Sequence, residues 1–195
     1  MWENQALFSN VYLRLGDMHL VMSYVGSTGS LMAGSGKTEI LSEAFAGVLK
    51  MLTGKKYPDN VRALRMLVEE IIRPLFQTQN WVAWLIFSRH WMMQHHSIKL
   101  WVNCLIKPVF TIMKYIRAER EADWCLHLAC VREMMPLFFA ASHCNYARYG
   151  LYYIRTMAAI PEDVRQHFVN GEHTMHHNPG LFNVSGAIWR SRPRL

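Results

Sequence analysis

The residues with the most evident chemistry are in the short segment Gly34–Thr38, which reads Gly-Ser-Gly-Lys-Thr. A lysine and a hydroxyl placed directly after glycines are how a phosphate-binding loop presents donors and a cation to a nucleotide. The Walker A pattern, however, also needs a glycine where Leu31 stands and a buried strand before the loop, whereas the apolar spacing over 21–32 predicts a helix. We therefore expect a turn between two helices. The alternative is a nucleotide-binding protein that uses Gly34, Gly36, Lys37 and Thr38.

Asp17 and His19 form a second candidate pair, as weak candidates for catalytic residues. They follow the one good strand candidate of the chain directly, and side chains at the end of a strand often reach a functional site. The other interpretation is structural, with Asp17 capping a helix and His19 packed in the core.

A histidine cluster near the C-terminal end could bind a metal. His173, His176 and His177 follow Glu172, and His173 and His177 are four residues apart, a spacing that chelates a metal on a helix. The segment continues into Asn-Pro-Gly and lacks the second fixed ligand pair of a zinc motif, so surface histidines in a loop are the other interpretation.

Composition limits the classes of function. The chain has 195 residues, of which 51% are hydrophobic and 18% charged, as in a globular protein. No apolar run is long enough to span a membrane, the N-terminus does not resemble a signal peptide, and the four cysteines fit reduced, packed thiols. We therefore expect an intracellular protein, nuclear or cytoplasmic, with no membrane association.

The positive charge suggests an anionic partner. A net charge of +7 and a pI near 9.4 fit DNA, although the basic residues are dispersed and a solvated basic surface is the other interpretation. The candidate contacts with nucleic acid are Lys55, Lys56, Arg62 and Arg65. A protein partner is another possibility. No cofactor is expected, and the sequence does not predict the oligomeric state.

The hydrophobic pattern predicts a mainly α protein, an irregular bundle of about seven helices with at most one or two short N-terminal strands. Alternation predicts a strand ending at Leu15, and helical spacing predicts helices after Asp17, around 41–52, from Pro58 to Pro74, over 98–116 with a break at Pro108, over 124–139 with an interruption at Pro136, over 145–157 and from Pro161. The domain assignment is an N-terminal extension at 1–8, a helical domain at 9–183 with an irregular segment at 76–97, and a disordered basic tail at 184–195.

Several motifs carry a resemblance to a known family. They are Leu13–Leu20, Lys50–Lys56, Asn60–Arg65, Leu100–Pro108, Asn145–Tyr153 and Gly171–His173. Together they resemble an uncharacterised, multicopy protein family of animal genomes that is derived from mobile elements. The resemblance covers most of 9–183, whereas 76–97 and 184–195 depart from the family's pattern.

The layout of that family is similar to ribonuclease-H-like transposases. The resemblance implies that 13–22 correspond to a strand and a histidine-bearing helix, that 44–157 correspond to a helical insertion, and that the catalytic aspartates lie upstream of Met1. The expected function is therefore a non-catalytic fragment of a transposon-derived protein, a helical module for DNA or protein interaction. A helical protein-interaction scaffold without a nucleic-acid role is a further alternative.

Overall fold

The computed structural model describes residues 11–44, 57–77, 89–173 and 188–190. Predictions for Lys55, Lys56 and His177 lie outside these ranges. Over the described residues the protein is mainly helical, which confirms the predicted class.

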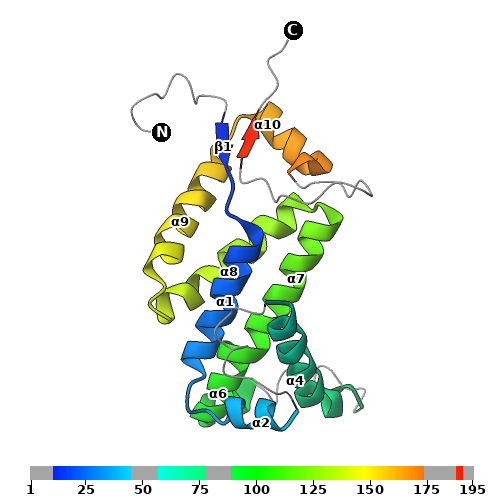
Figure 1. Ribbon diagram of the computed structural model, residues 1–195, viewed down its shortest axis with the longest axis vertical. Helices are drawn as coiled ribbons and strands as arrows, with labels where there is room; N and C mark the ends of the chain where they lie inside the picture. Colours follow the sequence, from blue (N-terminus) through cyan, green and yellow to red (C-terminus); the bar gives the residue numbers. More distant parts are fainter. Residues whose placement is uncertain (1–10, 45–56, 78–88, 174–187, 191–195) are drawn as a thin grey trace.

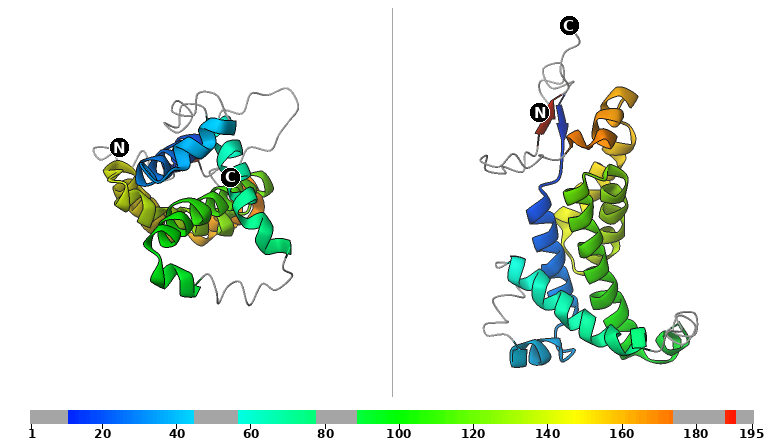
Figure 2. Two further views of the ribbon diagram at one scale, coloured as in Figure 1. Left: turned by 90° about the horizontal axis from the view of Figure 1, so that it is seen from below. Right: turned by 90° about the vertical axis from the view of Figure 1, so that its right-hand side faces the viewer.

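Figure 1 shows an elongated arrangement in which long helices run along the vertical axis and α4 lies across one end of them. The long helices are α1 (Asp17–Leu31), α7 (Lys107–Glu121), α8 (Trp124–Ala140) and α9 (Cys144–Ala158), and the crossing helix is α4 (Tyr57–Gln77). The shorter elements are α2 (Lys37–Ala44), α6 (His96–Trp101), α10 (Glu162–His167) and the π-helical turns η1 (Val102–Ile106) and η2 (Phe168–Glu172). The right-hand view of Figure 2 shows α4 lying obliquely over α1 and α7, with which it is in contact.

The core lies between α1, α7 and α8, with α4 and α9 completing it. The tight α7–α8 corner forms because Ala122 adopts a left-handed conformation (φ 55°) and the carboxylate of Asp123 accepts a hydrogen bond from the backbone N–H of Leu126 at 2.9 Å. This N-cap satisfies one of the free donors at the start of α8. On the other side of α8, a Cβ at Gly150 would meet the sulfur of Met135 at 2.5 Å, so glycine allows α9 to approach α8 closely.

Two short strands pair at one end of the bundle. β1 (Val11–Leu13) confirms the strand predicted there, and it pairs antiparallel with β2 (Ile188–Arg190), with Val11 opposite Arg190. The second strand therefore lies in the segment 184–195, which we predicted to be a disordered tail. For 188–190 that prediction is wrong, because pairing with β1 gives the backbone groups of both short strands partners.

The helices continue through all three prolines at which we predicted a break. At Pro108 the predicted split does not occur, because α6, η1 and α7 follow one another without a gap and Ile106 and Lys107 keep helical dihedral angles. Only the hydrogen-bonding pattern changes, from the π-helical turn η1 to the α-helix that contains Pro108 in its first turn. The breaks predicted at Pro74 and Pro136 are wrong, because α4 continues to Gln77 and α8 to Ala140. Both prolines lie in the last turns of their helices, where the bond that each removes is one of the last in the helix.

The segment predicted to be irregular, 76–97, is helical where the structure describes it except at His95, whose extended backbone separates two helical stretches. Residues 89–94 are helical and α6 begins at His96. Among the described helices, none combines the length and the apolar character needed to cross a membrane.

Candidate functional site

A network of buried and half-buried polar side chains joins the start of α1 to α7, α8 and α9. Arg14, which lies between β1 and α1, donates hydrogen bonds from Nη2 to Asp17 Oδ1 at 2.8 Å and to Glu119 Oε2 at 2.5 Å. Its Nη1 donates to the carbonyl oxygen of His173 at 2.7 Å, and the hydroxyl of Tyr115 donates to Asp17 Oδ1 at 2.8 Å. One arginine therefore connects three segments that are distant in sequence.

His127 extends this network to α9. Its Nδ1 lies against Glu119 Oε1, and its Nε2 is 2.9 Å from the hydroxyl of Tyr153. Nδ1 must carry a proton, because an ionised carboxylate has none to donate, so with a neutral ring Nε2 accepts the hydroxyl hydrogen of Tyr153. Trp124 stacks on the imidazole with an interplanar angle of 9° and fixes its plane.

The pKa values of the two carboxylates in the network are shifted in opposite directions. Burial on its own would raise the pKa of Glu119, but the hydrogen bond and charge of His127 and the guanidinium of Arg14 outweigh it and lower that pKa to about 2. Burial raises the pKa of Asp17, and Arg14 offsets this only in part. Burial likewise raises the pKa of Tyr115 and of Tyr153. Glu119 is thus the fixed negative charge around which the other groups are arranged.

Three members of the network have the chemistry of a metal site. Ligand atoms of Asp17, Glu119 and His127 lie within 4.8 Å of one another, and carboxylates with imidazole suit a divalent cation. The guanidinium of Arg14, however, already bridges the two carboxylates. The chain itself thus supplies the cation that balances them, and a metal would have to displace it.

His173, one of the two histidines predicted to bind a metal, is buried. His173 is only 6% exposed, so it is not a surface histidine, and its Nδ1 donates to the carbonyl oxygen of Phe168 at 2.7 Å. Burial lowers the pKa of His173 to about 4, which keeps the ring neutral at pH 7. Its Nε2 has no hydrogen-bond partner. Because His177 lies outside the described residues, the predicted pair stays a prediction.

Lys37 is buried against the end of α1 and is not exposed as a phosphate ligand would be. It is 1% exposed, and its Nζ lies 3.4 Å from the carbonyl oxygen of Thr28 and 3.5 Å from that of Gly29, in the last turn of α1. A cation at this end of a helix faces the negative end of the helix dipole. Burial lowers its pKa to about 8.

The loop before Lys37 also differs from a phosphate loop. Gly34 and Gly36 have positive φ angles of 71° and 84° and form a turn from α1 into α2, as the helix-to-helix interpretation predicts. The element before the loop is a helix and not a strand, and Ser35 donates its hydroxyl back to the carbonyl oxygen of Met32. The nucleotide-binding alternative for Gly34, Gly36, Lys37 and Thr38 therefore gains no support from this arrangement.

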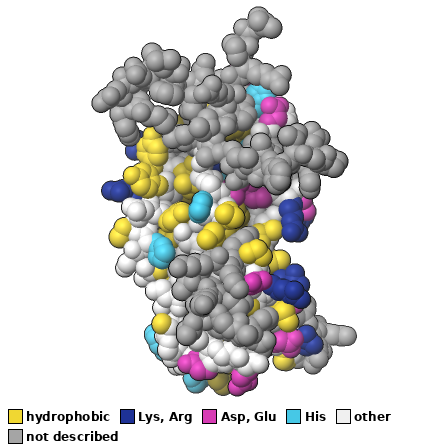
Figure 3. All heavy atoms as spheres, viewed as in Figure 1, with side chains coloured by type: hydrophobic (Ala, Val, Ile, Leu, Met, Phe, Trp, Pro, Cys, Tyr) yellow, Lys and Arg dark blue, Asp and Glu magenta, His cyan; other side chains and the backbone are white. Residues whose placement is uncertain are grey.

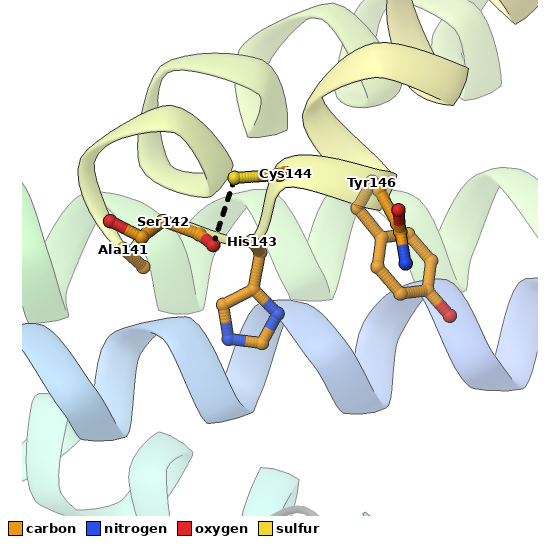
Figure 4. Close-up of a pocket in the computed structure, with 6 residues that line it drawn as sticks. Ala141, Ser142, His143, Cys144 and Tyr146 are labelled. Atoms are coloured by element: carbon orange, nitrogen blue, oxygen red, sulfur yellow. Dashed lines mark hydrogen bonds between the residues drawn. The ribbon is translucent and has the colours of Figure 1, made fainter.

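A small open pocket lies at the turn between α8 and α9. Its lining includes His143, Cys144 and Tyr146, and its volume is about 420 Å³. Figure 4 shows the sulfur of Cys144 directed at the carbonyl oxygen of Ser142, 3.4 Å away, while the imidazole of His143 points elsewhere. The thiol and the imidazole are therefore not arranged as a nucleophile and its base.

The exposed face of α9 is the clearest surface feature. Arg148, Tyr149, Tyr152 and Arg155 are all exposed, and Tyr149 and Tyr152 are 54% and 57% accessible. The guanidinium of Arg148 lies over the ring of Tyr149, 5.1 Å from its centroid. The sequence contains no Asp or Glu between Glu133 and Glu162. In Figure 3 the left side, where Figure 1 places α9, shows Lys or Arg and hydrophobic side chains without visible acidic ones, whereas on the right Lys or Arg side chains lie among acidic ones.

Comparison with known proteins identifies the family. A model described as Domain of unknown function (DUF8702) matches residues 1–84 and 85–187. The chain belongs to this family. The two matched segments meet inside 76–97, the part that departs from the pattern we used for the resemblance. No curated protein and no solved structure matches the chain.

Of the described residues predicted to act in a site, two join the network of this family member: Asp17 through its carboxylate, and His173 through its backbone carbonyl oxygen, which accepts from Arg14. His19, the predicted companion of Asp17, is exposed on α1, so the packed-histidine interpretation is wrong. Asp17 does not cap the helix either, because Gly16 occupies the N-cap position and the carboxylate binds Arg14 and Tyr115.

Sequence reasoning missed the other members of the network. They are Arg14, Tyr115, Glu119, His127 and Tyr153. One signal was available for His127, which shares the buried i, i+3 spacing of Trp124 and Cys130 on α8. All four cysteines are free, but Cys125 and Cys144 are exposed, so the prediction of packed thiols is wrong for these two.

Proposed function

We propose that this chain is a non-catalytic, transposon-derived helical module that binds DNA through the outer face of α9. The observation that carries the proposal is the set of four exposed residues on this helix, Arg148, Tyr149, Tyr152 and Arg155, in a stretch of sequence without acidic residues. The transposon origin rests on the resemblance of the family motifs.

Charge supports α9 as the contact surface. Arg148 and Arg155 form no ion pair with a described residue, so both guanidinium groups are available to phosphates. Seven residues of helix place them about 10 Å apart along the axis. Arginine suits this role because its planar group donates two parallel hydrogen bonds to a phosphate.

The contacts predicted from the sequence on α4 are weaker candidates. Arg65 pairs with Glu69 at 2.9 Å, and Arg73 pairs with Glu70 on the same helix. Arg62 is exposed, but it lies on this helix of mixed charge. A phosphate approaching α4 therefore meets carboxylates as well as cations, which weakens attraction to a polyanion.

The non-catalytic part of the proposal rests on the buried network. Its acids and bases bind one another, and Trp124 and Tyr153 cover the imidazole of His127. Groups engaged in this way hold helices together, because breaking one pair leaves the partner charge buried and uncompensated.

A salt-dependent binding experiment tests the proposal. Fluorescence anisotropy with labelled DNA should show binding that weakens as salt rises, and R148A/R155A should reduce the slope of log K against log salt by about 2 on a duplex. R65A/R73A is the matched control, because it removes the same charge from arginines that are already paired. Equal binding by both double variants, or no binding at low salt, would refute the proposal.

A protein-interaction scaffold is the second candidate. It is favoured by Phe139 and Leu151, which are 55% and 49% exposed at the end of α8 and on α9. Apolar contact with a protein partner depends little on salt. A partner whose binding is lost in F139S/L151S but unchanged in R148A/R155A would support this function over DNA binding.

A further inference from the structure

We propose, resting on the DNA-binding function above, that the α9 face prefers single-stranded over duplex nucleic acid. The residues that distinguish the two ligands are the tyrosines. Tyr149 and Tyr152 expose more than half of their surface, and residues three apart on a helix are neighbours on its surface. The two rings thus form one aromatic surface flanked by cations.

An aromatic surface selects unpaired bases. In a duplex both faces of each base are covered by its neighbours, so a side-chain ring cannot stack on it without disrupting the helix. In a single strand the bases can turn outward and stack on aromatic side chains, and this stacking tolerates any sequence because every base has a π face.

Each tyrosine has an arginine beside it. Arg148 is held over the ring of Tyr149, and Arg155 follows Tyr152 at the i+3 position. The rise of about 10 Å between the two arginines equals about three stacked nucleotides at 3.4 Å each. A short single strand can therefore place phosphates near both cations while its bases contact the rings.

The opposite side of α9 keeps this face in position. Tyr153 is 3% exposed and its hydroxyl binds His127, while Gly150 lies directly against Met135. The helix that presents the tyrosines is thus fixed by buried contacts, and binding a strand needs no rearrangement of its backbone. Preorganisation of this kind reduces the entropy lost on binding.

The experiment compares single-stranded oligo-dT of about 16 nucleotides with a duplex of the same length at low salt, by fluorescence anisotropy. The wild type should bind the single strand more tightly. Y149L/Y152L should weaken single-strand binding about tenfold or more and duplex binding by much less, so that the preference for the single strand is lost. Y149F/Y152F is the matched control, because it keeps both rings and should retain the preference. Circular dichroism checks that each variant is folded.

The outcomes separate the two proposals. Duplex binding as tight as single-strand binding, or a preference that survives in Y149L/Y152L, would overturn the inference and leave DNA binding intact. If the wild type bound neither the single strand nor the duplex more tightly than R148A/R155A does, the proposed function itself would be overturned.

Discussion

Replacing Lys37 by methionine should stabilise the protein at neutral pH. The side chain is 1% exposed, and burial lowers its pKa from 10.5 to about 8. Each pKa unit corresponds to about 1.4 kcal/mol, so keeping the ammonium group protonated in the folded state costs about 3 kcal/mol at pH 7. Methionine fills a similar volume without charge.

The loss of hydrogen bonds reduces this gain only modestly. The contacts of Lys37 with the carbonyl oxygens of Thr28 and Gly29 are long, at 3.4 and 3.5 Å, and the Thr28 oxygen also accepts the backbone N–H of Met32 at 3.1 Å. Two weak bonds contribute about 1 kcal/mol together. The expected net effect of K37M is therefore an increase of about 2 kcal/mol in the free energy of unfolding at pH 7.

The pH dependence identifies the cause. Because the pKa of Lys37 is lowered in the folded state, the unfolded chain takes up the proton first as pH falls from 10.5, and the cost is complete below about pH 8. The advantage of K37M over the wild type should be largest at pH 7 and disappear towards pH 10.5. Comparing the two proteins cancels the titration of the other groups.

Urea unfolding followed by circular dichroism at several pH values is the assay. K99M is the control, because Lys99 is exposed and its replacement should change the free energy of unfolding by less than about 0.5 kcal/mol. A K37M protein that is less stable than the wild type at pH 7, or whose difference from the wild type does not vary with pH, would refute the reasoning.

Three further substitutions test local features by the same unfolding assay. D123A should lower the free energy of unfolding by about 1 kcal/mol, because the N-cap of α8 is lost. D123S should keep most of the wild-type stability, because serine can also cap a helix. Equal stability of D123A and the wild type would contradict the role of the cap. E119Q should cost about 3 kcal/mol at pH 7 because Arg14 and His127 lose their shared carboxylate. Because the pKa of Glu119 is lowered, the wild type should lose this advantage as pH falls from 4.5 to about 2, and a constant difference would count against it. H173F should remove the loss of stability that the wild type shows as pH falls from 6.5 to about 4, since burial lowers the pKa of His173; parallel pH profiles would exclude this contribution.

Helix positions could be predicted from the sequence because they depend on local periodicity. The break predicted at Pro108 does not form, because a π-helical turn directly before the proline lets the helix continue through it. Pro74 and Pro136 misled the same reasoning, since the cost of a proline depends on how many helical bonds follow it and on the packing around it. Met135 and Leu137 on either side of Pro136 are buried, which holds α8 together.

The buried network could not be predicted in the same way. Arg14 and Glu119 are separated by 105 positions, so no local pattern connects them, and only the packing of α1 on α8 and the α7–α8 corner brings them together. Asp17 could be singled out because it follows a strand, but the identity of its partners is a property of the fold.

The pairing of β1 with β2 determines how the protein would respond to mechanical force. Val11 and Arg190 lie opposite each other, and so do Leu13 and Ile188, so a pull applied at residues 11 and 190 acts on the same end of the two-stranded ladder. The hydrogen bonds of the ladder would be loaded one after another rather than together, and the strands would unzip at low force. Arg14 is the next residue after β1, and its ion pairs with Asp17 and Glu119 would be the first strong resistance to further extension.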